Sequence, residues 1–514
     1  MYFDYSKKLS RMRMSSWALL SAYSVAGLAQ GNRPNVILIL ADDLGYGDLS
    51  CYGAHRVSTP AVDRLAQRGV LFTDAHAAAS TSTPSRYGLL TGSLPCRKPN
   101  TNVAQGNAGM IISPDQFTLA DVFHSQGYAT AAIGKWHLGL GSTTAQQDWN
   151  AQLDQHPGDL GFDYSYIMAA TADRVPCVFI EDGHVVNYDS SAPIEVSYQK
   201  RFPDVPTYHE TPVEELKQRS SHGHDYAVVN GIGRIGWMKG GGKALWKDEN
   251  LADSILAHAL GFMDLHRDEP FFMYLATNDV HVPRYPNDRF RGKSPMGVRG
   301  DVIMQFDWTV DQVMRHLEEL GIDDNTLIIL TSDNGPILDD GYDDRSEELV
   351  GDHRPGGIYR GAKYSAYEAG NIVPFIVSWP GHVPQGKRSE AMVNQMDFVA
   401  SMAQLVGADI PQGQAPDSHS SLKTWMGKSK KSAPYCITMA QNRSLHIRSK
   451  RWKYIKPCDG PAMIQWGPKV ETGYKKMPQL FDMKKDPGET INVADKYPKI
   501  VQRMEDVLAA TIGK

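Results

Sequence analysis

The sequence is poor in cysteine: 5 of its 514 residues are Cys, and no two have the Cys-x-x-Cys spacing. Thiols this dilute do not form a disulfide scaffold. At most two bridges are available and one thiol is left over, so we expect buried free cysteines. Apart from the N-terminus, the sequence also lacks an apolar stretch long enough to span a membrane.

The chain has no excess of positive charge, since 53 Lys and Arg stand against 58 Asp and Glu, a formal net charge of −5. Residues 1–29 contribute +3, so their removal leaves −8. A mildly acidic protein has no general affinity for nucleic acid or anionic membranes. An anionic ligand would therefore need local positive charge. The length predicts two domains, one of them large.

The first 29 residues have the pattern of an export signal. A basic head between Lys7 and Arg13 precedes a short apolar run at 17–28, and the small-x-small pattern at 27–29 marks a cleavage site. A disordered tail and a membrane anchor are the alternatives. No cysteine follows the cleavage site, so a lipid anchor is not indicated. We expect a cleaved signal and a periplasmic or secreted protein.

Buried apolar runs alternate with helical patterns between residues 30 and 410. This alternation predicts a doubly wound α/β sheet in a large catalytic domain. After about residue 411 short strand-like runs and a terminal helix predict a small antiparallel subdomain, 411–514. The predicted strands are 35–41, 128–133, 271–276, 326–330, 375–379, 435–440, 445–448 and 452–455, and the predicted helices are 59–68, 117–124, 251–266, 301–320, 392–405 and one from 498.

Hard oxygen donors follow two of these strands directly. Asp42 and Asp43 come after the strand at 35–41, and Asp333 and Asn334 follow the one at 326–330. Ligands of open α/β sheets gather beyond the carboxyl ends of strands. Three carboxylates and an amide suit calcium or magnesium. The alternative for each pair is an ordinary turn.

Cationic and imidazole side chains gather near the same strand ends. Lys135 and His137 lie at the end of the predicted strand at 128–133 and would point the same way in an extended segment. His281 follows another strand, and Lys363 lies ahead of a further one. Each alone is typical of a structural or solvated residue. Together with a divalent cation, the two lysines would form an anion pocket.

Ser82 lies where a helix is predicted to begin. Pro84 suits the start of that helix, which puts Ser82 just before its positive end, next to Ser85 and Arg86. This is a good position for a nucleophile that attacks an anion. A plain serine is nevertheless a weak nucleophile without a neighbouring base or metal.

Residues 82–92 (STPSRYGLLTG) resemble the signature of the type I sulfatases, Cys/Ser-x-Pro-Ser-Arg-x-x-x-x-Thr-Gly. The resemblance extends from about residue 35 to the end and implies an alkaline-phosphatase-like α/β fold: a large doubly wound mixed sheet flanked by helices, with a smaller C-terminal antiparallel α+β subdomain. The other matching motifs are ADDLGYGD, GKWHLG, His281, SDNG, RGAKYSAYEAG and LFDMKKDPGETINVA.

The resemblance implies a sulfuric ester hydrolase in which Ser82 is oxidised to formylglycine and hydrated to a gem-diol. One diol oxygen attacks sulfur, the alcohol leaves, and the sulfated hemiacetal then collapses and frees sulfate. Covalent catalysis through a diol beside a metal removes the weakness of serine. The implied calcium ligands are Asp42, Asp43, Ser82, Asp333 and Asn334.

Further roles follow from the same resemblance. Arg86 would stabilise the hydrated aldehyde, and Lys135 and Lys363 would hold sulfate oxygens. His281, with Lys363, would donate a proton to the leaving oxygen. His137 would take a proton from the second hydroxyl.

Two departures from the family pattern stand out. Ile372 replaces an arginine that the family often has, which should alter local packing and leave the chemistry intact. The signature begins with serine in place of cysteine, which implies an anaerobic-type sulfatase-maturating enzyme, a radical iron–sulfur protein, as partner. A maturation system that accepts only cysteine should leave Ser82 unconverted.

The long stretches 140–250 and 333–365 should shape a pocket for a sugar. Asp173-Arg174 and His353-Arg354 could hydrogen-bond sugar hydroxyls, with solvated loop charges as the alternative. By resemblance to bacterial glycan-degrading sulfatases we expect a sulfated galactose or N-acetylgalactosamine unit.

Two other functions stay open. A phosphatase, phosphodiesterase or phosphonate hydrolase of the same superfamily would hold two transition metals, and the two lysines here favour one metal and sulfate. An unconverted, non-catalytic sugar-binding homologue is the second alternative.

Overall fold

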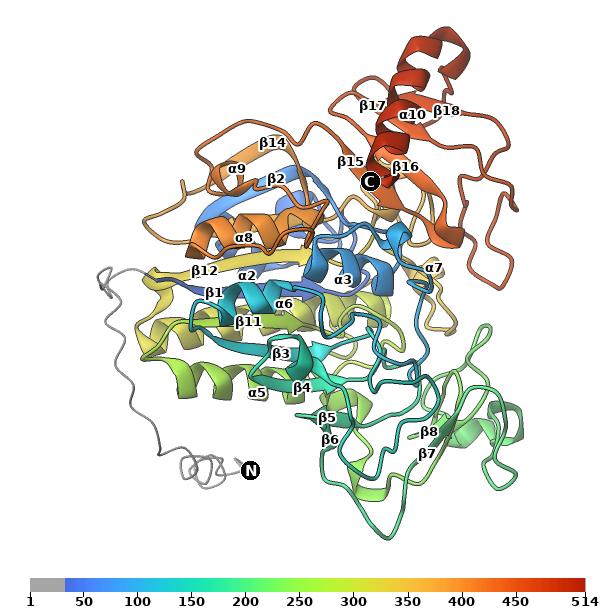
Figure 1. Ribbon diagram of the computed structural model, residues 1–514. Helices are drawn as coiled ribbons and strands as arrows, with labels where there is room; N and C mark the ends of the chain where they lie inside the picture. Colours follow the sequence, from blue (N-terminus) through green and yellow to red (C-terminus); the bar gives the residue numbers. More distant parts are fainter. Residues whose placement is uncertain (1–32, 514) are drawn as a thin grey trace. The chain divides into compact units, whose positions relative to one another are not determined.

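Ten strands form the central sheet of the computed structural model, which describes residues 33–513 (Figure 1). The expected signal segment, 1–29, lies outside the described residues. The strand order is β14 (Lys387–Asn394), β2 (Gly69–His76), β13 (Phe375–Ser378), β12 (Thr326–Ser332), β1 (Asn35–Ala41), β11 (Phe271–Ala276), β3 (Ala129–Lys135), β4 (Tyr164–Met168), β5 (Phe179–Glu181), β6 (His184–Val185).

The sheet is mixed and covered on both faces. Strands β12, β1, β11, β3 and β4 run parallel, whereas β13 is antiparallel to both its neighbours. One helical layer contains α2 (Pro60–Gln67), α5 (Leu251–His266) and α6 (Gly297–Leu320), and the other contains α3 (Ser82–Thr91), α4 (Leu119–His124) and α8 (Phe398–Val406). The predicted doubly wound sheet is confirmed.

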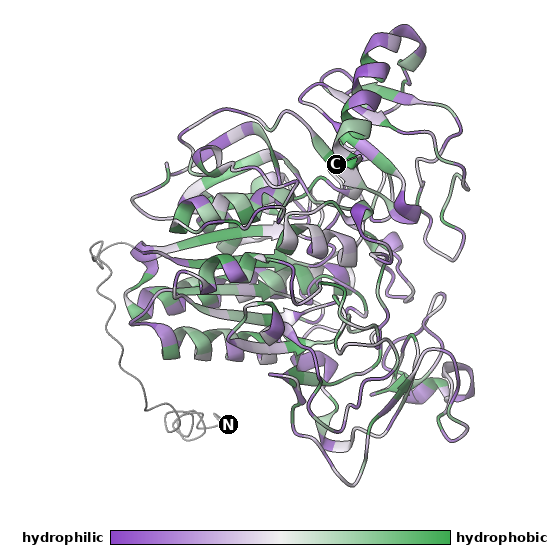
Figure 2. Cartoon of the chain, viewed as in Figure 1, coloured by the Kyte–Doolittle hydropathy of each residue, from purple (hydrophilic) through white to green (hydrophobic). Residues whose placement is uncertain are grey.

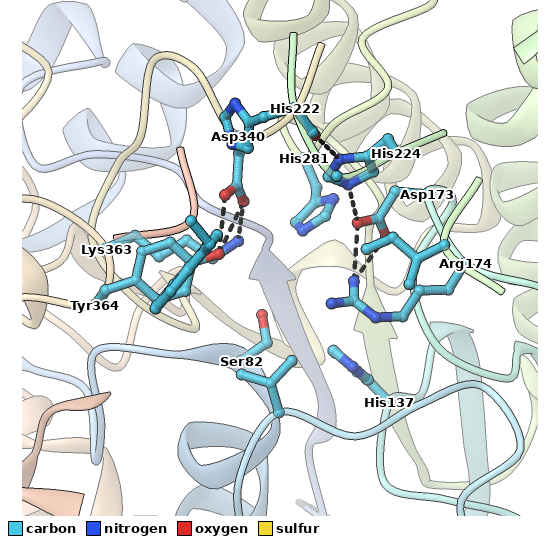
Figure 3. Close-up of a pocket in the computed structure, with 14 residues that line it drawn as sticks. Ser82, His137, Asp173, Arg174, His222, His224, His281, Asp340, Lys363 and Tyr364 are labelled. Carbon is cyan, nitrogen blue, oxygen red and sulfur yellow. Dashed lines mark hydrogen bonds and ion pairs between the residues drawn. The ribbon is translucent and has the colours of Figure 1, made fainter. Parts of the chain in front are cut away.

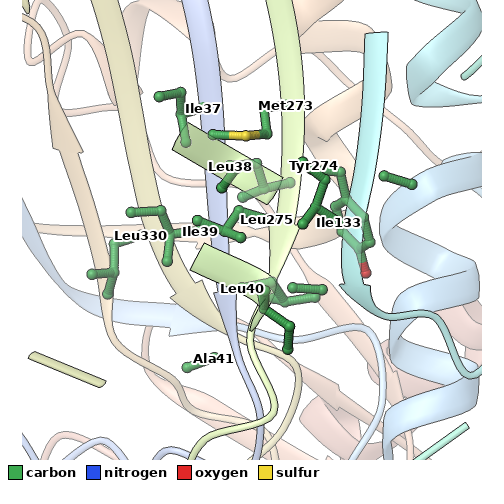
Figure 4. Packing of buried hydrophobic residues seen from close by; sticks show 14 of the residues in the cluster. Ile37, Leu38, Ile39, Leu40, Ala41, Ile133, Met273, Tyr274, Leu275 and Leu330 are labelled. Carbon is green, nitrogen blue, oxygen red and sulfur yellow. The ribbon is translucent and has the colours of Figure 1, made fainter. Parts of the chain in front are cut away.

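The core follows from the apolar strand runs. Every residue of β1 is buried, and Ile37, Leu38, Ile39 and Leu40 pack against residues of β11, β3 and β12 (Figure 4). A strand that lies between two helical layers must be apolar on both faces, which is why NVILILA does not alternate. Figure 2 shows apolar residues along the central strands and polar ones on outward helix faces.

A separate four-stranded antiparallel sheet lies in the C-terminal part, as expected. Its strands are β15 (Cys436–Met439), β16 (Leu445–Arg448), β17 (Trp452–Ile455) and β18 (Gln479–Asp482), with helix α10 (Pro498–Ile512) beside them. Residues 34–514 form one compact unit, so the boundary between 30–410 and 411–514 stays a prediction. The remaining short elements are β7 (Glu195–Ser197), β8 (Val228–Val229), β9 (Ile232–Gly233), β10 (Trp237–Lys239), α7 (Ser346–Leu349) and α9 (Leu422–Trp425).

The helix predicted at 392–405 was wrong at its start, and some strands of the large sheet, among them β2, were not predicted. The helix expected at 392–405 begins only at Phe398, because residues 392–394 still pair with β2 as the end of strand β14. Strand β2 itself was missed, since buried Asp74 and His76 interrupt its apolar pattern. All five cysteines are free, as expected, but only Cys177 and Cys436 are buried, whereas Cys51, Cys96 and Cys458 are partly exposed. In residues 33–513 no helix is long and apolar enough to cross a bilayer.

Candidate active site

Four acidic and amide side chains meet at one edge of the sheet. Strands β1 and β12 are parallel neighbours, with Ala41 opposite Ser332, so the residues after each strand emerge side by side. Asn334 Nδ2 donates to Asp43 Oδ1 over 2.7 Å, and the Asp43 amide donates to Asp333 Oδ1 over 3.3 Å. The members of this acidic cluster, all buried, are Asp42, Asp43, Asp333 and Asn334.

Ser82 points into this acidic cluster. It is the first residue of α3, which begins two residues earlier than Pro84 had suggested. Its hydroxyl donates to Asp333 Oδ2 over 2.7 Å and accepts from Lys135 Nζ over 2.9 Å. It also lies 3.3 Å from Asn334 Oδ1 and 3.4 Å from Asp42 Oδ1. The oxygen therefore lies between carboxylates and an ammonium group.

Three cations are paired with the carboxylates. Arg86 binds Asp333 Oδ2 through Nε at 2.9 Å and Nη2 at 2.8 Å. Lys135 Nζ lies 2.6 Å from Asp42. Lys363 Nζ binds Asp43 at 2.8 Å and Asp340 at 2.9 Å; burial opposes the charge of Lys363, yet Asp340 and Asp43 hold its pKa well above the usual value. Every carboxylate of the cluster thus has a cationic partner.

With Asp340, which shares Lys363 with Asp43, four carboxylates stand against the three cations Arg86, Lys135 and Lys363. Burial, together with Asp333 and Asp43, raises the pKa of Asp42 to about 8, although Lys135 opposes the shift. Oxygens of Asp42 and Asp43 and a ring nitrogen of His281 lie within 4.8 Å of one another. A set of hard, buried oxygen donors with uncompensated charge fits a hard divalent cation such as calcium.

Two buried histidines border the acidic cluster as neutral rings. Burial lowers the pKa of both His137 and His281 well below the usual value; Lys135 adds to the effect at both rings and Lys363 at His281. His137 Nε2 donates to the Ala104 carbonyl over 3.0 Å, and its Nδ1 has no hydrogen-bond partner among the described residues. His281 Nδ1 donates to a carbonyl over 2.6 Å, so its Nε2 is unprotonated. Each ring therefore offers one basic nitrogen.

A pocket that is partly open to solvent lies above Ser82 (Figure 3). Figure 3 shows Asp173, Arg174 and His224 on one side of Ser82 and the lysine and tyrosine at 363–364 on the other. The residues that line the pocket are Ser82, Val103, His137, Asp173, Arg174, His222, Gly223, His224, Ile235, His281, Asp340, Lys363, Tyr364 and Trp466.

The expected pair Asp173 and Arg174 lies in the pocket and is joined there by a histidine. Arg174 Nη1 lies 2.9 Å from Asp173 Oδ1, and His224 Nε2 lies 2.9 Å from Asp173 Oδ2. Burial opposes ionisation of Asp173, but Arg174 and His224 outweigh it and hold its pKa well below the usual value. Arg174 thus supplies donors to the pocket beside the Asp173 carboxylate, and His224, which also bonds the His222 carbonyl, holds that carboxylate in place.

Sequence reasoning missed several lining residues, among them His222, His224, Asp340, Tyr364 and Trp466. Tyr364 could have been found from the sequence, because it directly follows Lys363 in the RGAKYSAYEAG motif. Asp340 lies six residues after Asn334, and its carboxylate binds Lys363. The histidines and Trp466 come from remote loops and have no local pattern that marks them.

His353 and Arg354, expected as sugar ligands, do not line the pocket. His353 is buried and its Nε2 lies 2.8 Å from Asp48 Oδ1, while Arg354 is exposed. Arg299 binds the two oxygens of Asp48 at 2.8 and 2.6 Å. Burial opposes ionisation, yet Arg299 and His353 lower the pKa of Asp48 to about 2. The polar pair His353 and Arg354 thus divides between an internal ion pair and the surface.

Replacing Arg299 with Met should destabilise the fold, because it leaves Asp48 charged and buried without its bidentate partner. We expect a loss of about 3–5 kcal/mol in the free energy of unfolding, measured by urea denaturation. Arg345→Met, which removes an exposed partner of Glu348, should cost less than about 1 kcal/mol. His353→Gln should lower stability without changing KM; a raised KM at unchanged stability would contradict the internal role.

Comparison with known proteins gives consistent matches. The model of the family "Sulfatase" matches residues 34–408, and that of "N-sulphoglucosamine sulphohydrolase, C-terminal" matches 361–514. An N-acetylgalactosamine-6-O-sulfatase of Bacteroides thetaiotaomicron is 50% identical, covering 93% of this chain and 92% of that protein. Human arylsulfatase A is 30% identical over 94% of this chain and 88% of its own length.

Solved structures agree with these matches. One, described in connection with the metabolism of glycosaminoglycans by Bacteroides thetaiotaomicron, superimposes with a TM-score of 0.92 at 49% identity. The match covers 94% of this chain and all of that one. Both the large sheet and the small C-terminal sheet are therefore shared with it.

Proposed function

Because the chain belongs to the sulfatase family and is a sulfuric ester hydrolase that acts on a sulfated glycan, we propose that it removes the 6-O-sulfate of an N-acetylgalactosamine or galactose unit. One observation carries the proposal: a relative named for 6-O-sulfated N-acetylgalactosamine is 50% identical over nearly the whole chain. The galacto configuration and position 6 rest on that relative.

The chemistry we propose needs two groups that the chain does not supply as synthesised. When Ser82 is oxidised to formylglycine and hydrated, it supplies the nucleophilic oxygen that an ordinary serine lacks. Calcium, held by Asp42, Asp43, Asp333 and Asn334, supplies positive charge for that oxygen and for the sulfate. The oxidation requires an anaerobic-type maturating enzyme, since residue 82 is a serine.

The side chains around Ser82 would bind and orient the sulfate group. Lys135 Nζ, 2.9 Å from Ser82 Oγ, and Lys363 Nζ, which lines the same pocket, place two ammonium groups beside the sulfate oxygens. Arg86 has the Lys135 carbonyl and Asp333 as partners, so its guanidinium stays fixed behind Ser82. Positive charge that is already oriented stabilises the charge that develops in the transition state.

The two histidines have opposite tasks in this proposal. His137 Nδ1, a basic nitrogen without a hydrogen-bond partner among the described residues, would accept the proton of the second hydroxyl group of the hydrated formylglycine when sulfate is released. His281 donates to the leaving sugar oxygen from Nε2 and must therefore be protonated in the complex. The negative charge of the bound sulfate ester raises the pKa of His281 and favours that protonation.

The triad of Asp173, Arg174 and His224 would read the sugar hydroxyls. Asp173 accepts and Arg174 donates, so an axial hydroxyl can be bound in both directions at once, while His224, whose two ring nitrogens bind Asp173 and the His222 carbonyl, holds Asp173 in position. A buried polar group that loses its partner is costly, so a sugar without that hydroxyl would bind poorly. Export through the 1–29 signal would bring the enzyme to its glycan in the periplasm or outside the cell.

Sulfate release tests the activity directly. Purified enzyme with oxidised residue 82 should release sulfate from N-acetylgalactosamine 6-sulfate, and Ser82→Ala should abolish release because the nucleophile is lost. Mass spectrometry of the Ser82 peptide from the native host should show a mass two hydrogens below that of serine. Faster release of phosphate from a matched ester, or an unmodified peptide in the native host, would contradict the proposal.

Removal of the metal should lower both activity and stability. Chelation takes away the charge that offsets the acidic cluster, and calcium at about 100 times its Kd should restore about 2.7 kcal/mol. The measurement is thermal unfolding with and without calcium, with Asp43→Asn as the variant that loses most of the response. Identical melting temperatures in all samples would rule out a calcium site in the acidic cluster.

Loss of His224 should weaken discrimination between sugars. For His224→Ala we expect kcat/KM for N-acetylgalactosamine 6-sulfate to fall at least about tenfold relative to N-acetylglucosamine 6-sulfate, because Asp173 loses the ring that holds its carboxylate toward the axial hydroxyl. Steady-state kinetics on both sugars gives the ratio. His184→Ala, an exposed histidine outside the pocket, is the control; equal losses on both sugars would show that the triad does not read the axial hydroxyl.

A further inference from the structure

Trp466 differs in exposure from the other large residues of the pocket. Asp173, His281 and Tyr364 are 2%, 3% and 9% exposed, whereas Trp466 is 48% exposed. It lines the same pocket as they do. Trp466 therefore marks where the pocket ends and solvent begins.

The tryptophan stands at the tip of a short hairpin, residues 463–471, which we call the arm. The Ile464 amide donates to the Val470 carbonyl over 2.9 Å, and Met463 pairs with Glu471. Ile464 and Val470 pack against Ile337 and Tyr364 of the catalytic region. The arm thus brings a residue of the C-terminal part to the pocket of the large sheet.

The tip of the arm is held against the pocket rim. A side chain at Gly467 would meet the ring of His222 at 2.1 Å, so only glycine allows this approach. Lys469 forms an ion pair with Glu347 on the other side. With contacts on both sides, the arm presents Trp466 in a defined position.

The ring of Trp466 keeps a face for a ligand. It meets Tyr364 at 84°, with 5.4 Å between ring centroids, so at least one indole face is not covered by that contact. An exposed aromatic face at the mouth of a carbohydrate pocket suits the C–H face of a pyranose, since the negative face of the ring attracts C–H groups. A sugar fully inside the pocket would be surrounded by the buried polar residues instead.

We propose that Trp466 is a stacking platform for the sugar that adjoins the sulfated unit, a second saccharide subsite outside the pocket. This subsite rests on the proposed function, because it requires a glycan whose sulfated end occupies the pocket. The sulfated sugar lies within, and the next sugar emerges at the rim beside Trp466. The arm would then make the enzyme prefer oligosaccharides over a sulfated monosaccharide.

The test compares two substrates: N-acetylgalactosamine 6-sulfate alone, and a disaccharide with that unit at its non-reducing end. For Trp466→Ala, KM for the disaccharide should rise about tenfold more than KM for the monosaccharide, with the loss in KM and not in kcat. Trp466→Phe should keep most of the preference, because it keeps an aromatic face. Tyr188→Ala, an aromatic residue 41% exposed and outside the pocket, is the matched control.

Calorimetric binding of both saccharides to Ser82→Ala, with and without Trp466→Ala, repeats the comparison without turnover. An equal effect on both saccharides would assign Trp466 to the sulfated sugar itself and overturn the proposal, as would no effect on either. Failure of the wild-type enzyme to release sulfate from either substrate would count against the proposed function, while the binding data still decide on the platform. Binding of neither saccharide would overturn both.

Discussion

The parallel pairing of β1 with β12 is the constraint on which the site depends. It brings Asp42 and Asp43 beside Asp333 and Asn334, and so concentrates negative charge where water has little access. Such a concentration is stable only with compensating cations. The Arg86, Lys135 and Lys363 side chains, and the fit to a divalent cation, are consequences of that one pairing.

The same balance of charge orients the Ser82 side chain. Ser82 is held at the start of α3 by a carboxylate that accepts and an ammonium that donates, so its oxygen has little freedom to turn away. The loops around Ser82 shape the entrance of the pocket. They supply the polar triad on one side and the arm with Trp466 at the rim.

The strands that carry the site could be predicted because they are buried on both faces. Residues 35–41 and 271–276 match the structure to the residue, since a short continuous apolar run is typical of a strand that is buried between two helical layers. Strand β2 was missed because Asp74 and His76 are buried polar residues. Asp74 pairs with Arg448 and Lys450 of the C-terminal part, which no local pattern reveals.

The sequence by itself determined which side chains gather around Ser82, because strand ends and the motif around Ser82 are local features. Only the tertiary structure decided which loop residues share the pocket. His353 is buried against Asp48, whereas His224 and Trp466 line the pocket although they lie far from Ser82 in the sequence. The positions of these residues depend on long-range packing and on the pairing of buried charges. Neither can be recognised from the neighbouring residues in the sequence.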